Sequence, residues 1–183
     1  MESTVLNRHI YDYTMYMHAE AWTFLVNKSL EISPKSIIDI GGRNINGTPR
    51  DLWPKSKYVT LDHIGGKGVD IVADATNWEP TRKWDMGLCT EVFEHVTPED
   101  YRKVLVTLGK AINPGGTLLV TCATDPRAPH AAVGTPGMPV DEFYGNVDVE
   151  DLSKALVETN WKCVDIIVDR THGDIYVDAI NMN

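Results

Sequence analysis

The sequence predicts one α/β domain, residues 1–183, built on a doubly wound, mostly parallel sheet of seven strands. Short apolar runs alternate with segments of helical periodicity, which is the pattern of repeated βαβ units. The run at 36–40 lies between Pro34 and a Gly-Gly pair, as expected for a central parallel strand. Two further apolar runs surround a short polar turn near the C-terminus. They predict a hairpin that places one antiparallel strand in the sheet.

The individual elements follow from periodicity and from start and stop signals. Apolar residues at helical spacing predict an N-terminal helix over 8–30. Thr97-Pro98 followed by two acidic residues predicts the start of a second helix, which ends before the Asn-Pro-Gly-Gly segment at 113–116. A third helix is predicted from 148 or 150 to 160. The strands are predicted at 36–40, 58–62, 69–72, 83–89, 117–122, 161–169 and 174–180.

Composition limits the possible partners. The net charge of −9, from 17 basic and 26 acidic residues, argues against nucleic acid as the main partner. The three cysteines form no Cys-x-x-Cys pair, so we expect buried free thiols in a reducing compartment and no structural metal. The first residues lack the features of a secretory signal, and no apolar run approaches the roughly 18 residues that span a bilayer. We therefore expect a cytoplasmic, soluble protein.

A glycine turn and an acidic residue predict a ligand site at one edge of the sheet. Gly41 and Gly42 follow the first strand directly, and glycine allows the backbone to approach a ligand closely. In open parallel sheets, ligands bind beyond the carboxyl ends of the strands. Asp62 ends the second strand about 20 residues later, where a carboxylate is placed to accept both hydroxyls of a ribose.

The segment 123–146 is the one long irregular stretch. It contains four prolines and three glycines, and it begins where the fifth strand reaches the ligand edge. Long structureless segments in compact domains are often functional. A substrate-binding lid is one interpretation, and a tolerated surface insertion is the other.

These motifs together resemble the class I S-adenosylmethionine-dependent methyltransferases, in particular the methyltransferase type 11 group. The resemblance covers about residues 34–180 and implies a Rossmann-like methyltransferase fold. The family usually has Asp-x-Gly-x-Gly-x-Gly at its first motif, whereas this chain replaces the second and third glycines. In addition, Asn46-Gly-Thr-Pro-Arg50 is similar to a segment of a variant subgroup of the family. The segments that match the family itself are Asp39-Ile-Gly41, Asp62, Val72-Ala-Asp-Ala75, Cys89-Thr-Glu-Val-Phe-Glu-His-Val96 and Asn113-Pro-Gly-Gly-Thr-Leu-Leu-Val120.

The resemblance implies S-adenosyl-L-methionine as cofactor. Asp62 suits the ribose diol, and Asp74 with the Ala75 amide suits the adenine edge. Asp39 would hold the Gly41 loop or reach the cofactor's ammonium group. Glu91 either faces the same crevice or is a solvated helix-start acid, and the carbonyl of Cys89 or Thr90 is the expected contact of the methionine amine. The full set of expected cofactor residues is Asp39, Gly41, Gly42, Asn44, Asp62, His63, Asp74, Ala75, Cys89, Thr90 and Glu91.

Methyl transfer requires mainly positioning, with a base only if the acceptor must lose a proton. His130 in the lid and His95 are the candidate bases, although a histidine like His95 is often structural in this family. His18, Glu142 and Tyr144 are the expected substrate contacts. The chain lacks Pro-Pro-Tyr and Pro-Cys, the dipeptides of base-methylating DNA enzymes. A small-molecule or protein acceptor is therefore expected.

Two other functions remain open at this point. A nicotinamide-binding reductase would also use a glycine loop and Asp62, but it should show Gly-x-Gly-x-x-Gly, and residues 41–46 do not have that spacing. The altered glycine loop also leaves open a non-catalytic binding protein with a degenerate methyltransferase fold.

Overall fold

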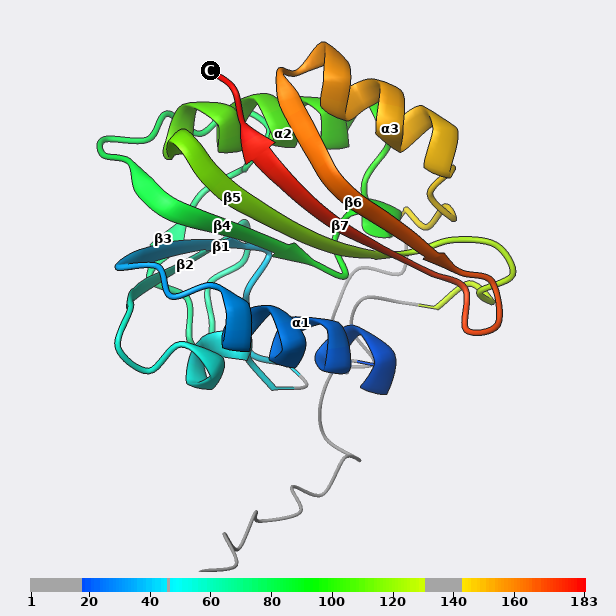
Figure 1. Ribbon diagram of the computed structural model, residues 1–183, viewed down its shortest axis with the longest axis horizontal. Helices are drawn as coiled ribbons and strands as arrows, with labels where there is room; N and C mark the ends of the chain where they lie inside the picture. The colour runs from blue at the N-terminus through cyan, green and yellow to red at the C-terminus, as the bar shows by residue number, and fades with distance from the viewer. Residues whose placement is uncertain (1–17, 46, 131–142) are drawn as a thin grey trace, which may run out of the picture.

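A seven-stranded sheet with strand order β3-β2-β1-β4-β5-β7-β6 forms the centre of the protein (Figure 1). The computed structural model describes residues 18–45, 47–130 and 143–183. β7 runs antiparallel to both of its neighbours, and every other neighbouring pair is parallel. The predicted doubly wound α/β fold with one antiparallel strand from a C-terminal hairpin is therefore confirmed.

The observed elements agree closely with those predicted. Their bounds are α1 Ala19–Glu31, β1 Ser36–Ile40, η2 Pro49–Leu52, β2 Lys57–Asp62, β3 Ile71–Val72, β4 Trp84–Thr90, η3 Phe93–His95, α2 Pro98–Ala111, β5 Ile112–Ala123, α3 Val149–Glu158, β6 Trp161–Asp169 and β7 Asp174–Asn181.

Side-chain caps fix where two helices begin. The Thr97 hydroxyl accepts a hydrogen bond from the Asp100 amide at 3.2 Å, and Pro98 occupies the first helical position of α2. The Asp148 carboxylate accepts bonds from two amides in the first turn of α3, each at 2.9 Å. The start of α2 was predicted from these residue types, and residue 148 was one of the two starts predicted for the third helix.

The N-terminal helix begins later than expected. His18 has a non-helical ψ of 138° and precedes α1, so the helix starts at Ala19 within the described residues rather than continuing through from residue 8. The predicted segment 8–17 lies outside the described residues. β5 is longer than predicted because Ile112 already pairs with Trp84, before a register shift in the Asn-Pro-Gly-Gly segment.

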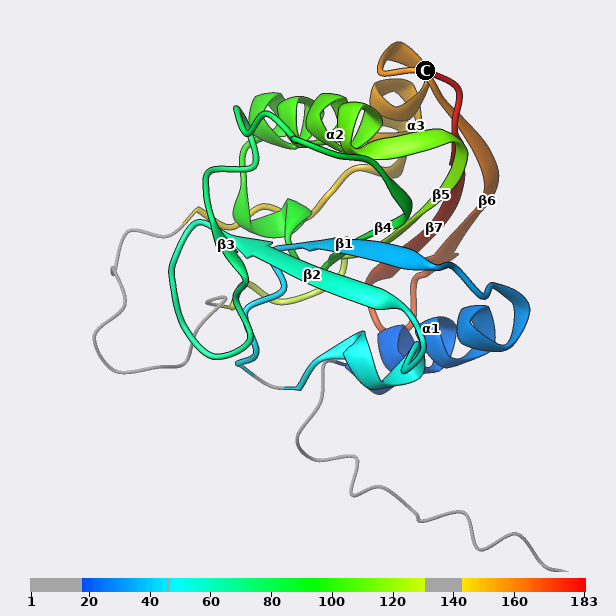
Figure 2. The same cartoon turned by 90° about the vertical axis from the view of Figure 1, so that its left-hand side faces the viewer.

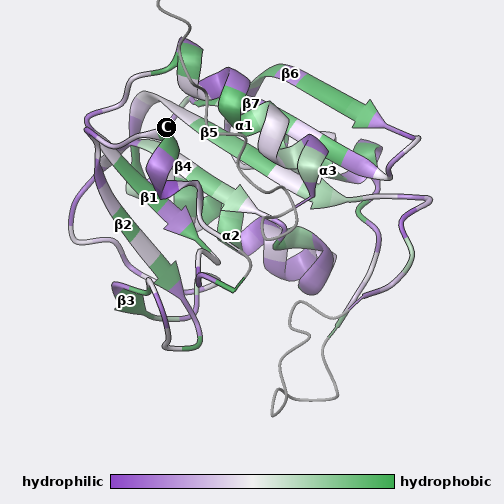
Figure 3. Cartoon of the chain, turned by 90° about the horizontal axis from the view of Figure 1, so that it is seen from below, coloured by the Kyte–Doolittle hydropathy of each residue, from purple (hydrophilic) through white to green (hydrophobic). Residues whose placement is uncertain are grey.

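Two hydrophobic layers cover the two faces of the sheet. α2 and α3 pack on one face and α1 on the other (Figures 1 and 2). Alternation along the strands sends side chains to each layer: Ile38 packs in the layer of α2 and α3, whereas its neighbour Ile37 packs with Leu25 of α1. In Figure 3 green, hydrophobic segments run along most strands, and purple, hydrophilic segments are frequent on the helices and loops.

The half of the sheet that contains β1, β2 and β3 is joined by loops. Among the described residues, the connections from β1 to β2, from β2 to β3 and from β3 to β4 contain no α-helix, and η2 is their only helical turn. The loops after β1 and β2 therefore lie directly at the sheet edge where a ligand was predicted.

None of the described helices is both long and apolar enough to cross a membrane.

Candidate functional site

The glycine turn after β1 needs two residues without side chains. Gly41 has a φ of +74°, and a Cβ there would lie 2.3 Å from Cγ2 of Val92. A Cβ on Gly42 would lie 2.2 Å from Oδ2 of Asp39. The turn therefore passes over the Asp39 carboxylate and packs against the segment after β4, and both close approaches need glycine.

Asp39 lies beneath this turn and is completely buried. Its Oδ2 accepts a hydrogen bond of 2.7 Å from the Tyr58 hydroxyl, whereas its Oδ1 accepts none within the described part of the chain. Burial raises the pKa of Asp39 to about 7, although the Tyr58 hydrogen bond and the Arg50 charge oppose this shift. The structure thus places Asp39 under the Gly41–Gly42 turn.

Asp62 holds the two loops that border the predicted ribose site. Its Oδ1 accepts from the Ile64 amide at 2.9 Å and its Oδ2 from the Arg43 amide at 3.3 Å. The imidazole of His63 lies 3.3 Å from Oδ1 and is largely exposed. A carboxylate has about four lone-pair positions, so Asp62 retains capacity to accept further hydrogen bonds.

The residues predicted for the adenine edge form an exposed turn after β3. The Oδ1 of Asp74 accepts hydrogen bonds from the backbone amide and the hydroxyl of Thr76, both at 2.8 Å. Its Oδ2 lies 3.5 Å from the side-chain amide nitrogen of Asn77. Ala75 is partly buried in the same turn. Asn44 instead uses its side-chain oxygen to accept from the Gly47 amide at 3.1 Å, so it shapes the glycine loop.

β4 ends at the same edge with a strained residue. Glu91 has a φ of +55°, which is uncommon for a residue with a side chain and is typical of functional sites. Its Oε1 accepts from the Thr121 hydroxyl at 2.7 Å, and burial raises its pKa above the ordinary value. Cys89 and Thr90 are buried at the end of β4, and burial raises the pKa of the Cys89 thiol.

Three predicted histidines and one tyrosine meet beside Glu91. The ring centroid of His130 lies 5.4 Å from that of His95, 6.1 Å from that of His18 and 4.8 Å from that of Tyr144. These residues come from three parts of the chain, namely the residue before α1, η3 and the segment 123–146, so the structure brings the predicted bases together with two of the three predicted substrate contacts. Glu142, the third contact, lies outside the described residues.

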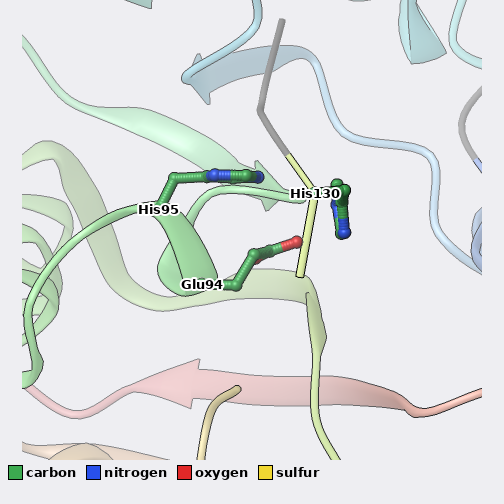
Figure 4. A group of neighbouring side chains, drawn as sticks. All are labelled: Glu94, His95 and His130. Atoms are coloured by element: carbon green, nitrogen blue, oxygen red, sulfur yellow. The ribbon is translucent and has the colours of Figure 1, made fainter. Parts of the chain in front are cut away.

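Glu94 is a member of this cluster that the sequence analysis did not single out. Its side chain is completely buried, and neither carboxylate oxygen accepts a hydrogen bond of normal geometry from the described residues. Burial, and then the charge of Glu91, raises the pKa of Glu94 well above its usual range, and the nearby amides of Glu94 and Ala123 oppose this shift. In Figure 4 its carboxylate points toward His130 and His95. The Glu-Val-Phe-Glu-His motif, which places Glu94 next to His95, was the sequence feature that could have pointed to Glu94.

An ion pair supports the cluster from the β6–β7 hairpin. Arg127 contacts the buried Asp174 carboxylate, and its Nε donates to the His172 carbonyl at 2.9 Å. A second guanidinium nitrogen contacts the ring of His18. Arg127 and Asp174 are 47 residues apart, so no sequence motif could connect them.

The fold is similar to that of solved methyltransferases. One comparison structure is a DhpI–SAH complex, with a TM-score of 0.68 and 17% identity over 93% of this chain and 89% of that one. A second is an S-adenosylmethionine-dependent methyltransferase from Clostridium acetobutylicum, with a TM-score of 0.68 and 13% identity over 91% and 93% of the two chains.

A third comparison structure is the N-methyltransferase NodS from Bradyrhizobium japonicum in complex with S-adenosyl-L-homocysteine. Its TM-score is 0.65, with 15% identity over 90% of this chain and 87% of that one. The sequence matches no family model and no curated protein. At these low identities the likeness establishes the fold: the chain has the class I S-adenosylmethionine-dependent methyltransferase fold, as the resemblance implied.

Proposed function

We propose that the protein is an S-adenosylmethionine-dependent methyltransferase that acts on a small-molecule or protein acceptor. One observation carries the proposal. The Gly41 turn, the Asp62 carboxylate and the Asp74 turn follow β1, β2 and β3 at a single edge of a sheet with the methyltransferase strand order. That edge is where ligands bind in open α/β sheets.

The residues at this edge fit the parts of the cofactor. Asp62 would accept from the ribose hydroxyls, and Asp74 with the Ala75 amide would contact the adenine edge. The buried Oδ1 of Asp39 has no hydrogen-bond partner among the described residues and lies under the loop that would face the methionine end. The remaining proposed contacts are Gly41, Gly42, Asn44, His63, Cys89, Thr90 and Glu91. When bound, S-adenosylmethionine supplies an electrophilic methyl group.

The cluster next to this edge is the proposed acceptor site. His95 and His130 are the candidate bases for an acceptor that loses a proton, and His18, Tyr144 and Glu142 are the proposed acceptor contacts. Burial raises the pKa of Tyr144 to about 12, so its hydroxyl stays protonated at neutral pH and can donate a hydrogen bond. Its present partner is Oδ1 of Asn146 at 2.9 Å.

The charge of the chain favours the proposed acceptor class. A net charge of −9 disfavours a polyanionic nucleic acid, and the described residues of the site include the carboxylates of Glu91, Glu94 and Asp174. We also propose a cytoplasmic location, in keeping with the separate, non-paired cysteines, of which Cys89 and Cys122 are buried.

Cofactor identity can be tested directly on the purified protein. Mass spectrometry should find co-purifying S-adenosylmethionine or S-adenosylhomocysteine, and calorimetry should detect one S-adenosylhomocysteine per chain. Titration with NAD serves as the control and should give no heat of binding. Saturable binding of NAD, without binding of S-adenosylhomocysteine, would instead favour the reductase.

A separate experiment distinguishes an enzyme from a non-catalytic binding protein. The protein is incubated with methyl-labelled S-adenosylmethionine and pooled small-molecule or protein acceptors, and labelled products are separated. Labelled product that requires His130 or His95 would support catalysis. Cofactor binding without transfer to either acceptor class would favour the binding protein.

A further inference from the structure

Glu94, His95 and His130 form a candidate metal centre. Each residue offers one ligand atom, and these atoms all lie within 4.8 Å of one another. Figure 4 shows the three side chains converging, with the Glu94 carboxylate directed toward the space beside the two imidazoles. We propose that this cluster binds one divalent transition-metal ion through one carboxylate oxygen and two imidazole nitrogens.

The Glu94 carboxylate is the observation that favours an ion over ordinary packing. A completely buried carboxylate without hydrogen-bond partners is costly, and buried charges in proteins are normally paired or bind a metal. Among the described residues no cation contacts Glu94. An ion at the cluster would supply the missing partner.

The charge around the cluster also favours a cation. The Glu91 carboxylate lies beside the same cluster, because its Oε2 is 3.9 Å from Nε2 of His18, whose ring centroid is 6.1 Å from that of His130. The guanidinium of Arg127, which contacts His18, is already paired with Asp174. Among the described residues, neither Glu91 nor Glu94 forms an ion pair with a lysine or arginine that could take the place of a bound cation.

The geometry requires only a small adjustment on binding. Ligand atoms about 2.1 Å from an ion in tetrahedral or octahedral geometry lie roughly 3–3.5 Å from one another. Closing the cluster from its present separation therefore needs movements of about 1 Å. His130 lies on an irregular segment rather than on a helix or strand, so its ring can supply most of this movement.

The donor set indicates the kind of ion. Two imidazoles and one carboxylate suit Mn²⁺, Fe²⁺, Co²⁺ or Zn²⁺, and three protein ligands leave positions open for another ligand. Mg²⁺ prefers oxygen ligands and is not expected here. The proposal differs from the sequence expectation of no structural metal, which rested on the absence of a Cys/His cluster with ligand spacing and did not include a carboxylate from η3 with a histidine 36 positions away.

The position of the centre suggests its role, which rests on the proposed function. Glu94 belongs to η3, and Val92, just before η3, packs against Gly41 of the cofactor loop. An ion there would bind a hydroxyl oxygen of the acceptor and lower the pKa of that hydroxyl, releasing its proton to solvent. His95 and His130 would then act as ligands and not as bases. The inference thus specifies a hydroxyl-bearing acceptor.

The test measures metal binding without any cofactor. The full-length protein is freed of metal with a chelator and titrated with Co²⁺, with binding followed by visible absorption and calorimetry. We expect one Co²⁺ per chain, displaced by Zn²⁺ and retained in millimolar Mg²⁺. The variants Glu94→Gln and His130→Gln should each weaken Co²⁺ binding at least about tenfold. His172→Gln, which removes an imidazole from the β6–β7 hairpin, should leave binding unchanged.

Separate control measurements test the folding of the variants and the proposed cofactor binding. Glu94→Gln removes a buried ionisable group without changing its size, and His130 is on an exposed segment, so both variants should keep the wild-type circular dichroism spectrum. Absence of stoichiometric Co²⁺ and Zn²⁺ binding, displacement by Mg²⁺, or wild-type affinity in either ligand variant would overturn the proposal. Calorimetry with S-adenosylhomocysteine on the metal-free protein tests the proposed function independently.

Discussion

Asp62 is the single residue on which cofactor affinity should depend most. Asp62 is 7% exposed, and its carboxylate already accepts hydrogen bonds from the Arg43 and Ile64 amides, so it is held in place before a ligand arrives. Asp62→Ala would leave two ribose hydroxyls without a charged acceptor. We expect this variant to lose about 2–4 kcal/mol of S-adenosylhomocysteine affinity, as measured by calorimetry.

A control variant separates this effect from a general change in charge. Asp51 is an exposed acid on η2, and Asp51→Ala removes the same charge without touching the proposed site. Affinity should be unchanged in Asp51→Ala. Equal affinities in the wild type and Asp62→Ala would exclude Asp62 from the site.

Asp39 makes the stability of the fold depend on pH. The folded protein raises the pKa of Asp39 from 3.8 to about 7, so the folded state holds this proton more tightly than the unfolded chain does. The stabilisation is complete below pH 4 and is lost as the pH rises toward about 7. Its size is of order 4 kcal/mol.

Asp39→Asn should therefore flatten this dependence, because the amide does not titrate. The measurement is urea unfolding of both proteins across pH 4 to 8. Asp51→Asn is the control and should keep the wild-type fall in stability. A fall of the same size in Asp39→Asn would show that another group causes it.

At the scale of elements, much of the fold was predictable because local signals agree with tertiary packing. The Thr97 and Asp148 caps start their helices where expected, and each apolar run became a strand. The start of α1 was not predictable, because helical periodicity continues through His18 while the backbone there has a non-helical ψ of 138°. Periodicity indicates which face is buried and does not fix where a helix begins.

The turn between β1 and η2 should tolerate no side chain at Gly41. Gly41→Ala would combine a left-handed backbone with a Cβ 2.3 Å from Val92. Gly115 is a matched control: its φ of +76° is almost the same, but a Cβ there would meet nothing within 4 Å. We expect Gly115→Ala to cost about 1–2 kcal/mol of unfolding free energy, from backbone strain alone.

Gly41→Ala should cost more than Gly115→Ala because it adds the clash to the same strain. Its affinity for S-adenosylhomocysteine should also fall, whereas that of Gly115→Ala should not. Denaturant unfolding and calorimetry measure the two effects. Equal unfolding free energies in the two variants would show that the turn accommodates a methyl group.

The proposed lid remains a prediction, because residues 131–142 lie outside the described structure. Its described ends are tied to the fold: the Gly145 amide donates to the Glu94 carbonyl at 2.8 Å, and the Val147 amide donates to the Ala123 carbonyl at 2.9 Å. Amides of the central part of 123–146 should exchange faster than those of β4 and β5, and should slow when S-adenosylhomocysteine is added. Protection equal to that of the central strands in both states would favour a fixed surface insertion.

At the scale of the whole molecule, the site was harder to predict than the fold. Residues at the ends of β1 and β2 were predictable, because a strand followed by glycine or an acid is a local pattern. Glu94 and the Arg127–Asp174 pair were not, because their roles depend on burial and on contacts between distant segments. Sequence spacing alone does not show which side chains the fold buries together.

The proposed cofactor should stabilise the whole domain, because its contacts come from β1, β2 and β3, which the described loops join without an α-helix. A ligand that binds only the folded state at 100 times its Kd adds about 2.7 kcal/mol to the free energy of unfolding. We expect S-adenosylhomocysteine to give this gain in urea unfolding, and NAD at the same concentration to give none. In Asp62→Ala, the same concentration of S-adenosylhomocysteine should give less than half of the gain, since the weaker affinity brings the ligand close to its Kd. A gain that persists undiminished in Asp62→Ala would place the ligand away from the edge formed by these strands.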